Sequence, residues 1–245
     1  MEKRRPSLLQ VDHKYCPGCG HGIVNRLVAE VLEEMGEEGT ALCAVAVGCS
    51  SLMPDTWGTD IVQAQHGRAA AVAVGMKRCR PENIVFAYQG DGDAIAIGLS
   101  ETLWAAIRNE NITVIHINNN NFGMTGGQMS PTTLEKQKTT TTPFGRNTAL
   151  TGKPLDIIKM LNTLDVAYLA RGTVINNAEI LKTKKYIRKA FDKQKARAGY
   201  SMVEILSPCP TNWKMPPLEA CKRIADVVTA VYPLGEFADS SKGAE

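Results

Sequence analysis

The chain has 245 residues, 44% of them hydrophobic, which is enough for one large domain with a single core. Its formal net charge of +3 is too balanced to predict a protein that binds nucleic acid. Seven cysteines, an odd number in a chain this long, argue against a disulfide scaffold and favour a reducing compartment. The longest apolar runs, residues 41–47 and 69–74, are too short to span a membrane, and no signal peptide is expected. We therefore expect a cytoplasmic protein.

Short apolar runs typical of strands alternate with helical patterns along most of the chain. The spacing of apolar residues predicts helices over 23–35, 68–77, 99–109, 155–164, 178–198 and 218–231. Strands are predicted over 41–47, 84–89, 112–118, 166–169 and 202–206. This alternation predicts an α/β fold, a mostly parallel sheet with helices on both faces. We expect one domain over residues 1–235 and a disordered polar tail over 236–245.

Residues 122–153 interrupt this alternation. They show little apolar periodicity and contain a run of threonines at 139–142. A loop of this length inside a compact domain is uncommon unless it is functional. The sequence leaves open whether the segment is a functional loop or a mobile surface loop.

Three predicted strands end in glycine-rich or polar residues, namely Gly48-Cys49-Ser50, Gly90-Asp91-Gly92 and the four asparagines 118–121. Ligands of open parallel sheets bind at this edge. The carboxylate of Asp91 and the amide oxygen of Asn119 are hard donors that suit Mg²⁺ carrying phosphate oxygens. Either motif alone would be an ordinary turn. Because the two residues stand 28 positions apart (119 − 91 = 28), at the two ends of one strand–helix–strand unit, together they predict a magnesium–phosphate site.

Two cysteines lie close together in the stretch YCPGCGHG. Cys16 and Cys19 suit a redox pair, half of a zinc site or half of an iron–sulfur site. Cys49 and Cys209 fall on predicted loops at the ligand-binding edge of the sheet, and prolines flank Cys209. Four thiolates suit either zinc or a [4Fe–4S] cluster, and their spacing does not separate the two. The remaining cysteines are interpreted as structural thiols: Cys43, Cys79 and Cys221.

Longer motifs carry a family resemblance. The segments QGDGDAIAIGLSE (89–101) and INNNNFGMTGGQMSPTT (117–133) resemble the thiamine diphosphate motif, which runs from GDG to a pair of asparagines. With CPGCGHG, VGCS (47–50) and QHGR (65–68), the chain is similar to the β subunits of 2-oxoacid:ferredoxin oxidoreductases over about residues 12–213. The resemblance implies a thiamine diphosphate-binding fold.

The resemblance also implies a set of site residues. In that family Mg²⁺ is held by the aspartate of GDG, the first motif asparagine and a backbone carbonyl two residues on, which match Asp91, Asn119 and Asn121. Family members place a [4Fe–4S] cluster on four cysteines, which match Cys16, Cys19, Cys49 and Cys209. The residues implied to line the cofactor are Val47, Gly48, Cys49, Ser50, Gln65, His66, Gly67, Arg68, Gly92, Asp93, Gly123, Met124 and Thr125.

The activity implied by the resemblance is the oxidative decarboxylation of a 2-oxoacid to acyl-CoA and CO₂. Thiamine diphosphate would accept the electron pair left by CO₂, the cluster would pass electrons to ferredoxin, and coenzyme A would receive the acyl group. In this family the glutamate that activates the cofactor lies on a partner subunit, and no matching glutamate occurs here. We therefore expect no catalytic residue in this chain. The expected partners are an α subunit and further small subunits, with no nucleic acid and no membrane.

Alternatives stay open from the residues themselves. One is a thiamine diphosphate-dependent lyase subunit with a structural zinc, and another is an electron-transfer or scaffold subunit whose GDG segment binds no cofactor. His66 and Arg68 would equally suit the start of a helix. The basic helix over 178–198 would suit either the docking of an acidic ferredoxin or a solvated surface.

The loop over 118–133 also bears on the substrate, because it contains no Lys, Arg or His. The second carboxylate of 2-oxoglutarate would need a cationic partner. Family members that prefer 2-oxoglutarate often carry lysine at the position of Gly126. The loop therefore favours a branched-chain 2-oxoacid first and pyruvate second, with pyruvate and 2-oxoglutarate as the alternatives.

Overall fold

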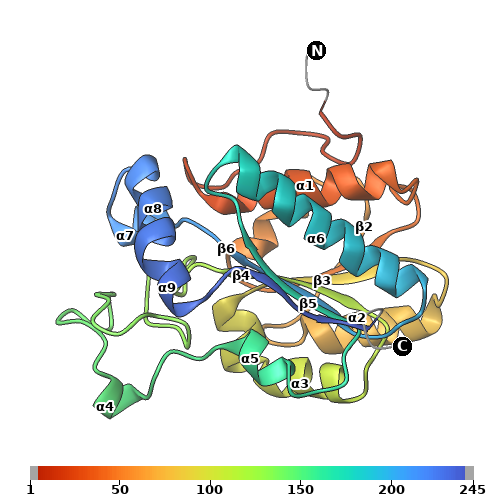
Figure 1. Cartoon of the computed structure of the whole chain (residues 1–245). Helices are drawn as coiled ribbons and strands as arrows, with labels where there is room; N and C mark the ends of the chain where they lie inside the picture. Colours follow the sequence, from red (N-terminus) through yellow and green to blue (C-terminus); the bar gives the residue numbers. More distant parts are fainter. Residues whose placement is uncertain (1–4, 241–245) are drawn as a thin grey trace.

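A seven-stranded sheet forms the centre of the computed structural model, which describes residues 5–240 (Figure 1). The strand order is β2-β1-β3-β4-β6-β5-β7, and every neighbouring pair is parallel except β5 and β7. The strands are β1 (Leu42–Val45), β2 (Asp60–Gln63), β3 (Val85–Gly90), β4 (Thr113–Asn118), β5 (Tyr168–Thr173), β6 (Ser201–Leu206) and β7 (Gly235–Asp239). The predicted α/β fold with a mostly parallel sheet is confirmed.

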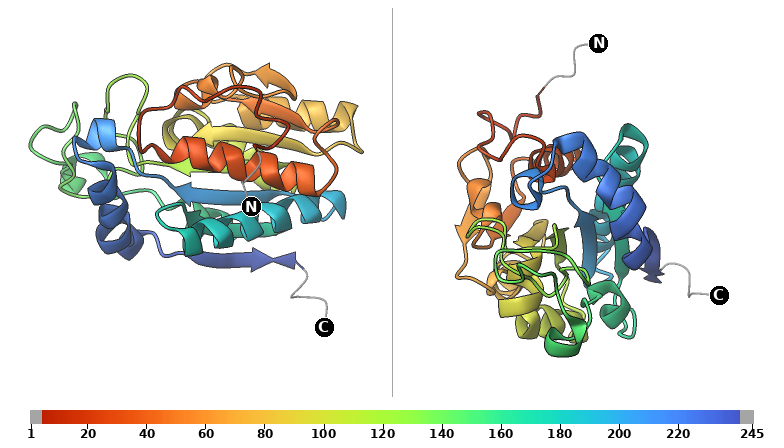
Figure 2. Two further views of the ribbon diagram at one scale, coloured as in Figure 1. Left: turned by 90° about the horizontal axis from the view of Figure 1, so that it is seen from above. Right: turned by 90° about the vertical axis from the view of Figure 1, so that its left-hand side faces the viewer.

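Helices cover both faces of this sheet. Figures 1 and 2 show α1 and α6 on one face and α2, α3 and α5 on the other, while α7, α8 and α9 lie at one end. The helices are α1 (Gly20–Glu34), α2 (Ala69–Cys79), α3 (Leu99–Ile107), α4 (Thr148–Thr151), α5 (Ile157–Leu161), α6 (Asn177–Lys195), α7 (Pro210–Trp213), α8 (Pro217–Arg223) and α9 (Thr229–Val231). No helix among residues 5–240 is long and apolar enough to cross a lipid bilayer.

The two faces of β3 belong to two separate apolar cores. Successive side chains of a strand point to opposite faces, so Phe86 and Tyr88 pack with α1 and α6, whereas Val85 and Ala87 pack with α2. A strand buried on both faces reads as one continuous apolar run, which is why 84–89 was predictable as a strand. Both cores hold the carboxyl ends of β1, β3 and β4 at one edge of the sheet.

The helix predicted over 218–231 is not a single regular α-helix. A π-helical turn, Ile224–Val228, separates α8 from α9. A second π-helical turn, Asp93–Ile97, follows the GDG motif and leads into α3. Such turns are rare and lie frequently at functional sites, so the second one draws attention to the end of β3.

The disordered tail expected over 236–245 is wrong for its first residues. Gly235–Asp239 form β7, which pairs antiparallel with β5. The Lys189 ammonium on α6 lies 2.5 Å from the Glu236 carboxylate and 2.7 Å from that of Asp239. Ion pairs and ladder hydrogen bonds therefore order a strand that carries few apolar side chains. Residues 241–245 lie outside the described part of the chain.

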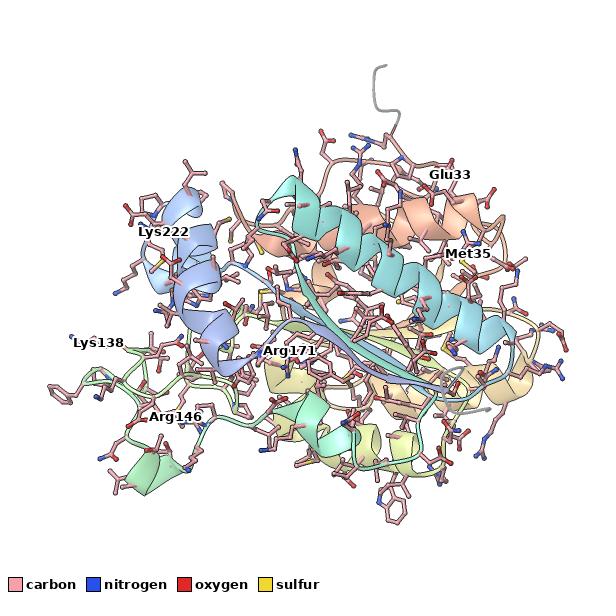
Figure 3. All side chains as sticks on the ribbon, viewed as in Figure 1. Glu33, Met35, Lys138, Arg146, Arg171 and Lys222 are labelled. Carbon is pink, nitrogen blue, oxygen red and sulfur yellow. The ribbon has the colours of Figure 1, made fainter. Side chains whose placement is uncertain are left out.

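The segment between β4 and α5 projects from the end of the sheet where α7 to α9 lie (Figures 1 and 2). Its one regular element is the short helix α4. Arg146, labelled in Figure 3, belongs to this segment and is buried. Its guanidinium donates to the backbone carbonyls of Ser130, Pro131, Thr133, Thr151 and Lys153 at 2.6 to 3.4 Å. The predicted long loop is thus ordered by polar contacts to its own backbone.

Candidate functional site

A cavity opens where β1, β3 and β4 end. Twelve residues that the sequence predicted as cofactor or magnesium contacts line it: Val47, Cys49, Ser50, His66, Asp91, Gly92, Asp93, Asn119, Asn121, Gly123, Met124 and Thr125. The parallel pairing of β3 with β4 brings the GDG and asparagine motifs together, as the spacing predicted. We call this space the strand-end cavity.

Asp91 is a buried carboxylate at the floor of the strand-end cavity, only 2% exposed. Its Oδ2 accepts a hydrogen bond from Ser130 Oγ at 2.8 Å and a second one from Thr132 Oγ1. Burial raises the pKa of Asp91 to about 6, although these donors and the Gly92 amide lower it. No ion pair to Asp91 forms among residues 5–240, so this carboxylate lacks a cationic partner from the described chain.

The asparagine loop supplies further oxygens beside Asp91. Asn119 and Asn121 are buried and line the same cavity. Asn121 Nδ2 donates to the Asn119 carbonyl at 2.7 Å, and Trp213 Nε1 donates to the same carbonyl at 3.1 Å. Between them Asn120 has φ +59°, a left-handed conformation that asparagine adopts more readily than most residues. A buried unpaired carboxylate with amide and carbonyl oxygens beside it is a donor set that fits Mg²⁺.

Asp93 has protein partners on both of its oxygens. Oδ1 accepts from the Gly67 amide at 2.7 Å and lies 2.5 Å from His66 Nδ1, while Gln89 Nε2 donates to Oδ2 at 2.6 Å. These contacts orient the His66 ring, whose edge meets the Phe122 ring at 6.5 Å between centroids. Asp93 therefore positions His66 in the wall of the strand-end cavity.

Two glycines permit the close packing of this wall. A Cβ on Gly92 would meet the Phe122 ring at 2.3 Å, and a Cβ on Gly123 would lie 3.1 Å from Cys49 Sγ. A side chain at Gly92 would therefore force the Phe122 ring to move. Glycine at this position keeps the space above Asp91 open for a bulky ligand.

Four predicted cofactor contacts do not line the strand-end cavity. Gln65 is exposed, and Gly67 packs against the backbone of Gly98. Gly48 has φ +106° and forms the turn before Cys49. The Arg68 guanidinium forms an ion pair with Glu101 on α3, and Arg68 is the N-cap residue of α2. Arg68 therefore lies at the start of a helix, which is one of the two interpretations that the sequence left open.

Several residues of the site were not singled out from the sequence. Ser130 and Thr132, which donate to Asp91, come from the loop that lacks apolar periodicity. Gln89 donates to Asp93, and Phe122 forms the aromatic wall. The stretch SPTT directly after the asparagine loop was a usable signal for hydroxyl donors, because serine and threonine gather where a buried carboxylate needs them.

A second cavity, of about 290 Å³, lies beside the first. Cys16, Cys19, Cys49 and Cys209 all line it, while Cys43, Cys79 and Cys221 do not. Cys209 is the N-cap residue of α7, Cys19 is the N-cap residue of α1, and Cys49 begins a 3₁₀ turn. We call this space the cysteine cavity.

Cys209 is buried in the wall of the cysteine cavity, Cys19 and Cys49 are partly buried, and Cys16 is exposed. Burial raises the pKa of Cys19 to about 12 and that of Cys49 to about 12, and the charges of neighbouring thiolates raise both further. Burial also raises the pKa of Cys209, although Asn212 lowers it by hydrogen bonding. With pKa values raised in this way, Cys19, Cys49 and Cys209 hold their protons unless a positive centre offsets the charge of the thiolates. Within residues 5–240, no three or more His, Cys, Asp or Glu residues surround one point as ligands of a single ion.

Comparisons with known proteins identify the fold family. Residues 43–205 match the family described as "Thiamine pyrophosphate enzyme, C-terminal TPP binding domain", thiamine pyrophosphate being another name for thiamine diphosphate. The 2-oxoglutarate synthase subunit KorB of Methanocaldococcus jannaschii is 38% identical over 205 residues, which cover 82% of this chain and 71% of the relative. A solved 2-oxoglutarate:ferredoxin oxidoreductase from Magnetococcus marinus is 30% identical with a TM-score of 0.74, over 86% of this chain and 70% of that one. The chain belongs to the 2-oxoacid:ferredoxin oxidoreductase family.

A further relative within the 2-oxoacid:ferredoxin oxidoreductase family differs in length. The ketoisovalerate oxidoreductase subunit VorA of Methanothermobacter thermautotrophicus is 38% identical over 232 residues, which are 94% of this chain and 49% of the relative. The chain thus spans about half the length of that subunit. Residues 43–205, which match the thiamine diphosphate-binding domain of the family, supply every lining residue of the strand-end cavity except His21.

Proposed function

We propose that this chain is the thiamine diphosphate-binding β subunit of an oxidoreductase that converts a 2-oxoacid and coenzyme A into acyl-CoA and CO₂. Two electrons would pass to ferredoxin through a [4Fe–4S] cluster. The observation that carries the proposal is a shared wall, because Cys49, Asn119, Gly123 and Met124 line both the strand-end cavity and the cysteine cavity. Groups bound in the two cavities would be neighbours, as electron transfer between them requires.

The strand-end cavity would hold Mg²⁺ and the diphosphate of the cofactor. Asp91, Asn119 and the backbone carbonyl of Asn121 would ligate the metal, with phosphate oxygens completing its octahedron. Mg²⁺ would also supply the missing counter-charge of the buried Asp91 carboxylate. His66, held by Asp93, and the peptide at Gly92 would orient the cofactor. When bound, thiamine diphosphate supplies the electron sink for decarboxylation.

The cysteine cavity would hold the [4Fe–4S] cluster on Cys16, Cys19, Cys49 and Cys209. A single zinc ion needs four ligands at about 2.0–2.3 Å from one point, whereas within residues 5–240 no three or more His, Cys, Asp or Glu residues surround one point in this way, although all four cysteines line the same cavity. That spacing favours a centre of several atoms over one ion, and it favours four ligands over a redox pair of Cys16 with Cys19. The cluster, when bound, accepts the electrons one at a time.

The activating carboxylate would come from the partner α subunit. No glutamate lines either cavity within the described residues. The two aspartates that do are both engaged, Asp91 toward the metal position and Asp93 with His66, Gly67 and Gln89. This chain would therefore bind and orient the cofactor, while the proton transfer that activates it would need a residue from outside the chain.

The preferred substrate would be a branched-chain 2-oxoacid. Neither cavity has a lysine or arginine in its described lining. The strand-end cavity has two histidines, His21 and His66. Burial lowers the pKa of His21 to about 4, and its Nδ1 lies 2.8 Å from Tyr88 Oη. His66 is paired with Asp93. A second substrate carboxylate would thus find no free cation here, while Val47, Leu52 and Met124 offer apolar contacts.

The test is an anaerobic turnover assay of the complex purified with its natural partners. Ferredoxin reduction is measured with 2-oxoisovalerate, pyruvate and 2-oxoglutarate, each with and without coenzyme A. We expect coenzyme A-dependent reduction, fastest kcat/KM for 2-oxoisovalerate, and bound thiamine diphosphate. Decarboxylation without ferredoxin reduction would instead support the lyase, and a complex without thiamine diphosphate would support the scaffold.

A variant in the same assay tests the substrate argument. Gly126 has φ +110°, so a lysine at that position would be strained. Met124 lines both cavities and has no such constraint. Met124→Lys should therefore raise kcat/KM for 2-oxoglutarate relative to 2-oxoisovalerate by about ten- to a hundredfold, the value of one charge-assisted hydrogen bond. Met124→Leu is the control. An unmodified complex that prefers 2-oxoglutarate would contradict the argument.

A further inference from the structure

A row of buried polar side chains crosses three neighbouring strands behind the strand-end cavity. The strand register pairs His116 on β4 with Glu204 on β6, and Glu204 with Arg171 on β5. All three residues are fully buried. Figure 3 labels Arg171 near the end of the C-terminal helices. Charged residues are almost never fully buried unless they are paired, so this row needs an explanation.

Arg171 is the positive end of the row. Its Nε donates to Glu204 Oε2 at 2.5 Å, its Nη2 donates to Asp156, and its Nη1 donates to the Pro233 carbonyl at 3.2 Å. Burial alone would lower the pKa of Arg171, but Glu204 and Asp156 outweigh it and raise the pKa. The guanidinium therefore stays charged and forms an ion pair with the Glu204 carboxylate.

Glu204 in turn fixes the amide of Asn118. An ionised carboxylate only accepts hydrogen bonds, so Asn118 must turn its NH₂ toward Glu204 Oε1, at 2.8 Å. The carbonyl oxygen of Asn118 then faces the other way. It accepts from Asn120 N at 3.2 Å and from Asn120 Nδ2 at 3.0 Å. The charge on Glu204 thereby fixes the orientation of the Asn118 amide, and this amide in turn fixes the position of Asn120.

Asn120 is the residue on which the metal loop turns. It has φ +59° and lies between Asn119 and Asn121, the two positions assigned to Mg²⁺. Its Nδ2 also donates to the Thr132 carbonyl at 3.0 Å, and Thr132 Oγ1 donates to Asp91. The Asn120 side chain thus links the asparagine loop to Thr132, a hydroxyl donor to Asp91, and Asp91 is the third proposed ligand of Mg²⁺.

We propose that Glu204, paired with Arg171, is a positioning residue for the magnesium site and acts through Asn118 and Asn120. The inference rests on the proposed function of the strand-end cavity. Replacing a buried ion pair by apolar residues of similar size is often neutral for stability, so folding alone does not require these charges. The hydrogen bonds that lead from Glu204 to the asparagine loop give this ion pair a role in positioning the loop.

The test measures the apparent affinity of Mg²⁺, read as thiamine diphosphate binding in the intact anaerobic complex by calorimetry over a range of Mg²⁺ concentrations. Glu204→Gln keeps the shape but adds an NH₂ donor, so the orientation of the Asn118 amide is no longer fixed. We expect Mg²⁺ affinity to fall by about 10- to 100-fold. Binding of thiamine diphosphate should recover at high Mg²⁺, which a merely unfolded site would not show.

Two further variants keep the proposal open to refutation. The pair Arg171→Met with Glu204→Leu removes both charges and should show the same loss, even if the single variant fails to assemble. Asp156→Asn removes the second carboxylate that pairs with Arg171 and keeps a side chain able to cap α5. This variant should change Mg²⁺ affinity by less than about twofold. Unchanged Mg²⁺ affinity in the folded Glu204 variants, or an equal loss in Asp156→Asn, would overturn the inference alone. Binding that is independent of Mg²⁺ in the unmodified complex would overturn the metal site and the inference together.

Discussion

Asp91 and Asp93 stand two positions apart in one motif, yet their carboxylates have different partners. Asp93 is satisfied by His66, Gly67 and Gln89. Asp91 receives hydroxyl and amide hydrogen bonds but has no cation among the described residues. Asp91 precedes the π-helical turn and Asp93 begins it, and both residues line the strand-end cavity. This difference in partners supports the proposal that Asp91 is a metal ligand and Asp93 a positioning group.

The cysteines permit a matched test at the same scale. Cys209 lines the cysteine cavity, whereas Cys221 lies on α8 outside it. Cys209→Ala should remove the cluster, so that iron and sulfide fall from about four of each per chain to near zero. Cys221→Ala should keep both. The measurements are iron and sulfide content and the visible absorption of the anaerobically prepared complex. Full iron content in Cys209→Ala, or stoichiometric zinc in the unmodified complex, would refute the assignment.

Residue positions were predictable where the strand order alone decides them. Parallel strands end at one edge, so the sequence could bring Asp91 and Asn119 together without any side-chain detail. The partner of Arg68 was not predictable, because its ion pair with Glu101 depends on how α2 crosses α3. The proposed role of Glu204 was not predictable either, because it depends on the register of β5, β6 and β4.

At the scale of elements, the strongly apolar strands were predictable and the polar ones were not. β2 is an exposed edge strand, and β7 is a polar strand held by ion pairs, so neither shows an apolar run. The segment 122–153 has no periodicity because Arg146 orders it through backbone carbonyls rather than through a core. That segment supplies Ser130 and Thr132 to Asp91, so its order bears on the site.

Arg146→Lys tests this account of the loop. A lysine has no planar fork and cannot reach carbonyls from both ends of the loop at once. Leaving buried acceptors unpaired costs about 1–3 kcal/mol, so amide hydrogen exchange in 128–153 should become about tenfold faster or more. Arg78→Lys, at an exposed pair with Glu110, should leave exchange unchanged. Equal protection of the loop in both variants would show that Arg146 does not hold it.

On the scale of the whole molecule, the positive charge of α6 is used inside the chain. Lys184 lies 2.7 Å from Glu30 and 2.7 Å from Glu34 on α1, and Lys189 lies 2.5 Å from Glu236 on β7. Further pairs join Arg188 to Asp192, Lys193 to Asp239, Lys195 to Glu37 and Arg197 to Glu82. The basic helix thus ties α1 and β7 to the sheet, which favours the solvated-surface reading over a docking site.

This pairing of charges leaves little of the positive charge of α6 for a partner protein. Among the described residues of α6, Lys185 is a basic side chain without an ion pair, and no residue of α6 lines either cavity. A docking surface for an acidic ferredoxin would respond to reversal of this charge, and the response would fade with ionic strength. We expect Lys185→Glu to change the KM for ferredoxin by less than about twofold at low salt, with Lys185→Gln as the control for loss of charge alone. A KM that rises severalfold in Lys185→Glu and returns to normal at high salt would instead assign ferredoxin docking to α6.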